Sequence, residues 1–128
     1  VKLKPGALQY LLNLKNKGIK IGLATSNSMN LLTVTLKSNN AFELFDSITI
    51  TDEVKKSKSN PDIYLLAAKK LNVDPSECMV FEDIIAAARG AKLAGMKVTG
   101  VFDEHSKHQT DILKEECDNY IYNYEDLI

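Results

Sequence analysis

The sequence predicts an α/β fold in which helices cover both faces of a doubly wound parallel sheet. Short apolar runs, typical of strands buried on both faces, alternate with segments of helical periodicity. Alternation of strands and helices is the usual pattern of parallel sheets. The 128 residues contain no linker, internal repeat or low-complexity tract. This length suits one domain, residues 1–128.

The first half of the chain begins with a helix over residues 5–18, which has a leucine-rich face and stops at a glycine. An apolar strand follows at 19–24, and the polar cluster after it can cap a helix at 29–38. Residues 47–50 are β-branched and predict a second strand. A polar loop then leads to a helix at 61–71, whose first residue is a proline.

The second half repeats the alternation. A third apolar strand at 78–81 is followed by a helix at 84–95, which again stops at a glycine. The next strand covers 97–101, and a polar loop separates it from a helix at 110–116. A short strand with alternating tyrosines, 119–122, and a final helical turn complete the chain.

Composition narrows the class of protein. A formal net charge of −1 gives no electrostatic basis for binding nucleic acid or an anionic membrane. No run is long and apolar enough to span a bilayer, and no signal peptide is visible. Cys78 and Cys117 lack metal-binding spacing, which favours reduced thiols and a cytoplasmic location. The chain begins with Val1 instead of Met, so we expect a piece of a longer protein.

An acidic pair, Glu82 and Asp83, directly follows the third strand. Open α/β sheets bind their ligands at the carboxyl ends of the strands. Adjacent carboxylates repel each other in a partly buried crevice, and a hard cation such as Mg²⁺ would relieve that repulsion. The same pair could instead complement the dipole of the following helix. The pair alone does not decide between these interpretations.

Two other strand ends carry groups suited to phosphate. Thr25 and Ser26 follow the first strand and offer hydroxyl and N–H groups at a helix start, although a plain helix cap has the same residues. Lys58 lies in the loop after the second strand and could neutralise a phosphate or a carboxylate. Lys55 and Lys56 beside it also fit a solvated loop. Together the three segments place a hydroxyl, an ammonium group and two acids at one edge of the sheet.

In this order, the motifs resemble those of the haloacid dehalogenase superfamily, in its branch of β-phosphoglucomutase-like and phosphoglycolate phosphatase-like enzymes. The resemblance covers nearly the whole chain and implies a Rossmann-like core. It also implies a Mg²⁺-dependent phosphatase or phosphomutase that acts on a small phosphorylated metabolite, such as a sugar phosphate. The matching residues are Thr25, Ser26 and Asn27 for the phosphate, Lys58 for charge stabilisation, and Glu82 and Asp83 for Mg²⁺.

The sequence departs from the family pattern in two ways. The family's first motif, a central strand ending in Asp-x-Asp whose first Asp forms an aspartyl-phosphate, is absent from the 128 residues, as is the helical cap. Without that strand, two apolar sheet edges would be unpaired, so we expect that the nucleophile lies outside this piece and that the piece alone is inactive. In addition, Ile84 and Ala87 stand where close relatives usually have Ser and Gly. This change at the metal rim affects either metal affinity or full activity.

Other functions are also compatible with parts of the sequence. The scaffold could serve as a non-catalytic domain that binds phosphorylated ligands or has a regulatory role. A receiver-type signalling domain is disfavoured because its acids come early and its lysine late. Dinucleotide binding is disfavoured because no G-x-G-x-x-G motif is present. His105 and His108 fit a solvated loop better than a metal site. The sequence does not indicate the substrate, the choice between phosphatase and mutase, or the oligomeric state.

Overall fold

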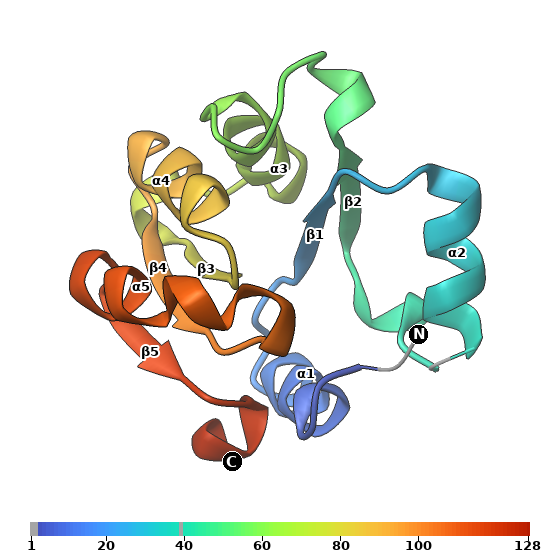
Figure 1. Ribbon diagram of the computed structural model, residues 1–128. Helices are drawn as coiled ribbons and strands as arrows, with labels where there is room; N and C mark the ends of the chain where they lie inside the picture. The colour runs from blue at the N-terminus through green and yellow to red at the C-terminus, as the bar shows by residue number, and fades with distance from the viewer. Residues whose placement is uncertain (1–2, 39) are drawn as a thin grey trace.

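A computed structural model of the protein describes residues 3–38 and 40–128, and it confirms the α/β class (Figure 1). The helices are α1 (Ala7–Asn16), α2 (Met29–Ser38), α3 (Asp62–Leu71), α4 (Ile85–Leu93) and α5 (Thr110–Glu116). The strands are β1 (Gly22–Thr25), β2 (Ser47–Ile50), β3 (Met79–Glu82), β4 (Lys97–Val101) and β5 (Asn119–Ile121). Short 3₁₀ helices are η1 (Phe42–Leu44), η2 (Thr51–Glu53), η3 (Pro75–Glu77), η4 (Glu104–Gln109) and η5 (Tyr124–Leu127).

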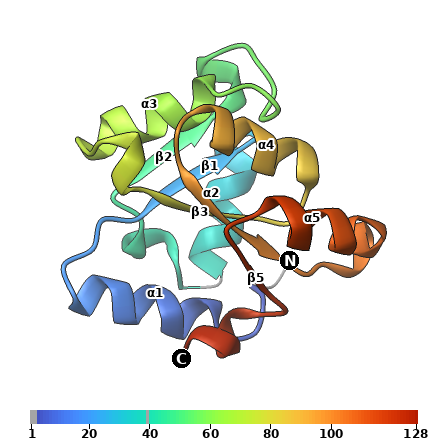
Figure 2. The ribbon, with the colours of Figure 1, turned by 90° about the vertical axis from the view of Figure 1, so that its left-hand side faces the viewer.

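The described strands form two parallel sheets instead of one. β1 pairs with β2, and β4 lies between β3 and β5. Figures 1 and 2 show that β1, not β2, lies on the side of its sheet toward β3. Within the described ranges, no ladder joins β1 to β3. The split therefore falls between the strands that carry Thr25 and Glu82, where the family resemblance places the first-motif strand.

Helices cover both faces of these strands, as expected for a doubly wound fold. Successive strand residues point to opposite faces, and the β1 pair Leu23 and Ala24 belongs to two different clusters. Ala24 packs against the cluster formed under α3, α4 and α5, whereas Leu23 packs with residues of α1 and α2. Fully buried side chains of the larger cluster include Ile63, Ala91, Val98 and Leu113. No helix among the described residues has the length and apolarity needed to cross a bilayer.

Several element ends differ from the sequence prediction. β1 starts at Gly22 instead of at Ile19, and Ile19 is 47% exposed. The strand also extends one residue further than predicted, to Thr25. The predicted loop after β4 folds into η4, because the Asp103 side chain accepts the N–H of His105 and caps it. The strand predicted at 119–122 is present as β5, at the edge of its sheet, but it ends one residue early at Ile121, so Tyr122 lies outside it.

Cys78 also departs slightly from its predicted place. It was expected in the third strand, but β3 begins one residue later, and the residue is only half-buried. Burial raises the pKa of the Cys78 thiol, and nearby Glu77 raises it further. The thiol is therefore held in its protonated, less reactive form.

Candidate functional site

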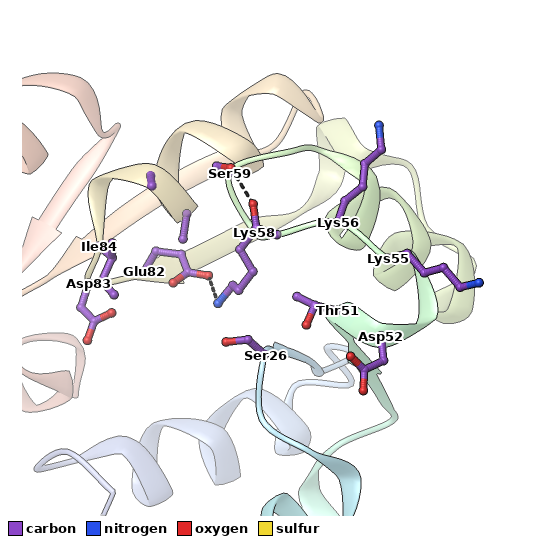
Figure 3. A pocket seen from close by; sticks show the side chains of 13 residues that line it. Ser26, Thr51, Asp52, Lys55, Lys56, Lys58, Ser59, Glu82, Asp83 and Ile84 are labelled. Carbon is purple, nitrogen blue, oxygen red and sulfur yellow. Dashed lines mark hydrogen bonds and ion pairs between the residues drawn. The ribbon is translucent and has the colours of Figure 1, made fainter.

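A cavity of about 550 Å³ lies where β1, β2 and β3 end (Figure 3). Ser26 follows β1, Thr51 follows β2, and Glu82 is the last residue of β3. Residues 51–59 and 82–87 supply most of the remaining lining. The carboxyl ends of strands are the usual ligand-binding edge of open α/β folds. Segments far apart in the sequence therefore converge on one cavity at this edge, and the cavity is several times larger than a phosphate group.

The centre of this cavity is an ion pair between Lys58 and Glu82. The Lys58 Nζ lies 2.5 Å from Oε2 of Glu82, and the Tyr64 hydroxyl donates to the same oxygen at 2.7 Å. Glu82 is only 8% exposed, and a carboxylate taken out of water is costly unless partners replace its lost hydration. Burial, and secondarily the Glu82 charge, raises the pKa of Tyr64. The phenol thus stays protonated and can donate.

Gly90 brings α4 against the loop that carries Lys58. A β-carbon at Gly90 would overlap the carbonyl oxygen of Lys58 and would stand 3.0 Å from that of Asn60. Only a residue without a side chain permits so close an approach of two backbones. Gly90 lies one helical turn after Ala87, the position where the family pattern usually has Gly. Its position inside an alanine-rich helix was the available signal.

Of the three predicted phosphate-binding residues at the end of β1, only one of those described lines the cavity. Ser26 lines the cavity, and Figure 3 shows its hydroxyl directed toward the side where Lys58 and Glu82 meet. The Thr25 hydroxyl accepts the N–H of Asn27 at 3.1 Å, which is the local contact expected of a cap. Of these three residues, Ser26 alone is among the described residues that line the cavity. Phosphate binding by Thr25 and Asn27 stays a prediction.

The turn that carries Asp83 is held by two residues of η4, Ser106 and Gln109. Asp83 is half-buried and lines the cavity, and its backbone carbonyl accepts the Ser106 hydroxyl at 2.7 Å. The side-chain oxygen of Gln109 accepts the N–H of Ile85 at 2.7 Å and thereby satisfies a free donor at the start of α4. Sequence reasoning missed Ser106 and Gln109, because a polar segment in a predicted loop gives no sign of its contacts.

Comparison with known proteins decides the family. The family model described as "haloacid dehalogenase-like hydrolase" matches residues 1–95. The chain belongs to the haloacid dehalogenase-like hydrolases. It is 45% identical over 96 residues to the protein YhcW of Bacillus subtilis (strain 168), a match that covers 75% of this chain and 44% of that protein. It is 40% identical over 99 residues to the beta-phosphoglucomutase of the same organism, covering 77% and 43%.

Solved structures of this family have the same fold. The crystal structure of a CbbY mutant from Rhodobacter sphaeroides in complex with xylulose-(1,5)bisphosphate superposes with a TM-score of 0.90 at 28% identity. That superposition covers 98% of this chain and 56% of the CbbY chain. The 128 residues thus span about half the length of the haloacid dehalogenase-like relatives they match.

The donor set in this member of the family fits Mg²⁺ in part. Glu82 and Asp83 both line the cavity, and Mg²⁺ is commonly held by one or two carboxylates together with water and substrate phosphate. Both contacts described above for Glu82 use Oε2. Within residues 3–38 and 40–128, no group of three or more His, Cys, Asp or Glu residues is placed to hold a metal ion. His105 and His108 accordingly take part in no such group.

Ile84 and Ala87 make the rim beside the acids apolar. Ile84 is 47% exposed and lines the cavity, and Ala87 lines it while being only 7% exposed. Neither side chain can donate or accept a hydrogen bond. A ligand next to Asp83 therefore meets a hydrocarbon surface where a serine would offer a hydroxyl.

Proposed function

We propose that this chain is part of a Mg²⁺-dependent phosphoryl-transfer enzyme, a phosphatase or phosphomutase acting on a small phosphorylated metabolite such as a sugar phosphate. The observation that carries the proposal is the convergence of Lys58, Glu82 and Asp83 on one cavity at the strand ends. Family membership supports the reaction class. The relatives named above include a phosphoglucomutase and a protein crystallised with a sugar bisphosphate, which support the substrate class.

Each cavity residue has a part in this proposal. The Lys58 ammonium neutralises negative charge on the phosphoryl group and on the attacking carboxylate, and such fixed charges act most strongly where water is excluded. The Ser26 hydroxyl and N–H group bind phosphoryl oxygens before the start of α2. The Thr25 hydroxyl and the Asn27 N–H join them once their contact with each other opens. Glu82 and Asp83 would hold Mg²⁺, which when bound neutralises charge on the substrate phosphate.

The nucleophile in this proposal is an aspartate outside the 128 residues. Nothing within the chain takes the place of the family's Asp-x-Asp strand, and the chain covers 44% of YhcW. The edges of β1 and β3 that face each other are unpaired within the described residues, and a strand added there would bring its carboxyl end beside Lys58 and Glu82. The aspartate would form an aspartyl-phosphate that water or a second hydroxyl then resolves.

The test is hydrolysis by the full-length protein. We expect release of inorganic phosphate from a panel of sugar phosphates in Mg²⁺, loss of turnover in excess EDTA, and recovery when Mg²⁺ is restored. Turnover that is indifferent to Mg²⁺ removal, or a full-length sequence without an Asp-x-Asp strand, would contradict the proposal. Phosphate-ligand binding without any turnover would instead support the non-catalytic alternative.

A further inference from the structure

The structure points to Tyr64 as a positioning residue for the metal-binding carboxylate: we propose that its hydroxyl fixes Glu82 so that Oε1 is the oxygen presented to Mg²⁺. This inference rests on the proposed function, because it assigns a role within the same site. Tyr64 belongs to α3 and is not one of the described residues that line the cavity. The sequence analysis did not single it out.

The Glu82 carboxylate is held on its core side by the buried Tyr64 hydroxyl. Tyr64 is 2% exposed, lies in the core cluster under α3 and α4, and donates to Oε2 of Glu82 at 2.7 Å. Its ring cannot move without disturbing close-packed neighbours. By contrast, Lys58 reaches the same Oε2 from a loop and on a flexible four-carbon stem. The rigid partner of the carboxylate is therefore the tyrosine.

Two donors on one oxygen constrain the carboxylate more than one donor does. The terminal torsion of a glutamate side chain is broad and roughly two-fold, so a carboxylate with a single partner can rotate and exchange its oxygens. With Tyr64 and Lys58 both on Oε2, Oε1 is left as the acceptor for another cation. Hydrogen-bond partners of metal-binding carboxylates commonly set metal affinity in this way.

A second consequence concerns Lys58, which must neutralise phosphate as well as Glu82 in the proposed reaction. If the lysine turns toward a phosphate, Tyr64 still satisfies Oε2, so the buried carboxylate is never left without a donor. The hydroxyl thus lets Lys58 exchange partners without releasing Glu82 from its orientation.

The experiment compares Mg²⁺ binding by the full-length wild-type enzyme and by Tyr64→Phe, using isothermal titration calorimetry with Mg²⁺ alone. Phe keeps the ring and removes only the donor. We expect the dissociation constant for Mg²⁺ to rise by roughly 10-fold or more, the effect usual for losing such a partner. Tyr120→Phe is the matched control, since Tyr120 packs against the same cluster and its hydroxyl contacts Thr110 at 3.4 Å. That variant should bind Mg²⁺ like the wild type.

A third variant separates positioning from general damage to the core. Tyr64→4-aminophenylalanine keeps an N–H donor at the same place and should restore Mg²⁺ affinity. The inference is overturned if the wild type binds Mg²⁺ and Tyr64→Phe binds it equally well or more tightly, or if the amino variant binds as weakly as Phe. If the wild type itself binds no Mg²⁺, the proposed function fails first and the inference falls with it.

Discussion

At the scale of single residues, the two buried threonines Thr49 and Thr99 differ in what their hydroxyls contact. Thr49 is 0% exposed, and its hydroxyl has no hydrogen-bond partner among the described residues. Thr99 is 3% exposed, and its hydroxyl donates to the sulfur of Met79 at 3.1 Å. A buried polar group without a partner loses its hydration without compensation.

We therefore predict that Thr49→Val, which replaces the hydroxyl by a methyl group of similar size, raises the free energy of unfolding by about 1 kcal/mol. Chemical denaturation of the full-length protein and the variant measures the change. Thr99→Val removes an existing contact and should give no such gain. A loss of stability in Thr49→Val larger than that in Thr99→Val would show that the Thr49 hydroxyl has a partner in solution.

Replacing Gly90 with alanine should change the free energy of unfolding in the direction opposite to that usual for a glycine inside a helix. Replacing a glycine inside a helix with alanine normally stabilises it by about 1 kcal/mol. Here the new methyl group would overlap the carbonyl oxygen of Lys58, so Gly90→Ala should lower the free energy of unfolding by about 1–3 kcal/mol. Because the loop that carries Lys58 must shift, turnover should fall as well. A variant as stable and active as the wild type would mean that this loop moves freely away from α4.

Single residues also show what a sequence can reveal. The acids, Lys58 and Ser26 were predicted at one edge because each follows a strand, and they do line one cavity. Tyr64 was missed because a tyrosine on the apolar face of a helix is most simply a core residue, and its hydroxyl contact depends on where β3 ends. For Thr25, the residues alone favour a helix cap and the family resemblance implies phosphate binding; the contact present is the local one with Asn27.

At the scale of elements, the order of helices and strands could be predicted because hydrophobic period, prolines and glycines act locally. Gly18, predicted as the stop of the first helix, has a φ of +76°, the left-handed conformation that glycine adopts most easily. Boundaries were less accurate, since tertiary hydrogen bonds set them. The Asp46 carboxylate, for example, accepts the N–H of Ile21 at 2.7 Å just before β1 begins, and the two residues are far apart in sequence.

Asp118 fixes the entry of β4 in a similar way, and this contact predicts a pH dependence. Its carboxylate accepts the N–H of Val98 at 2.8 Å and is paired with Lys92 at 3.0 Å. The backbone hydrogen bond first, and then Lys92, lower the pKa of Asp118. A carboxyl group whose pKa is lower in the folded state stabilises the fold above its unfolded-state pKa, and this contribution is lost as the pH falls through the folded-state value.

The free energy of unfolding should therefore decrease as the pH is lowered below about 4, the ordinary pKa of an aspartate. Asp118→Asn should be less stable at neutral pH by less than about 1 kcal/mol, because the group is partly exposed, and its stability should fall less steeply in acid. Denaturant titrations of both proteins between neutral and acid pH measure the two slopes. Equal acid slopes would show that Asp118 does not contribute.

At the scale of the whole molecule, the division between β1 and β3 connects fold and function. Helices pack on both faces, yet the described strands do not form one continuous sheet between them. The sequence allowed the doubly wound class and the position of this division to be predicted, because the family resemblance orders its motifs along the sheet. Substrate identity could not be predicted, since in this family the cap and the residues around the first motif largely choose the substrate, and neither is present in the 128 residues.

The most direct test of the account is the turnover of the full-length enzyme with Lys58 replaced by alanine, measured on a sugar phosphate at saturating Mg²⁺. Lys69→Ala is the matched control, because Lys69 is exposed on α3 and is not among the described residues that line the cavity. We predict that Lys58→Ala lowers kcat by roughly 10²–10³-fold, the usual loss when a fixed charge at the transition state is removed. The control should stay within about two-fold of wild type, as surface substitutions usually do. Wild-type turnover in Lys58→Ala would contradict the assignment of this cavity as the site of phosphoryl transfer.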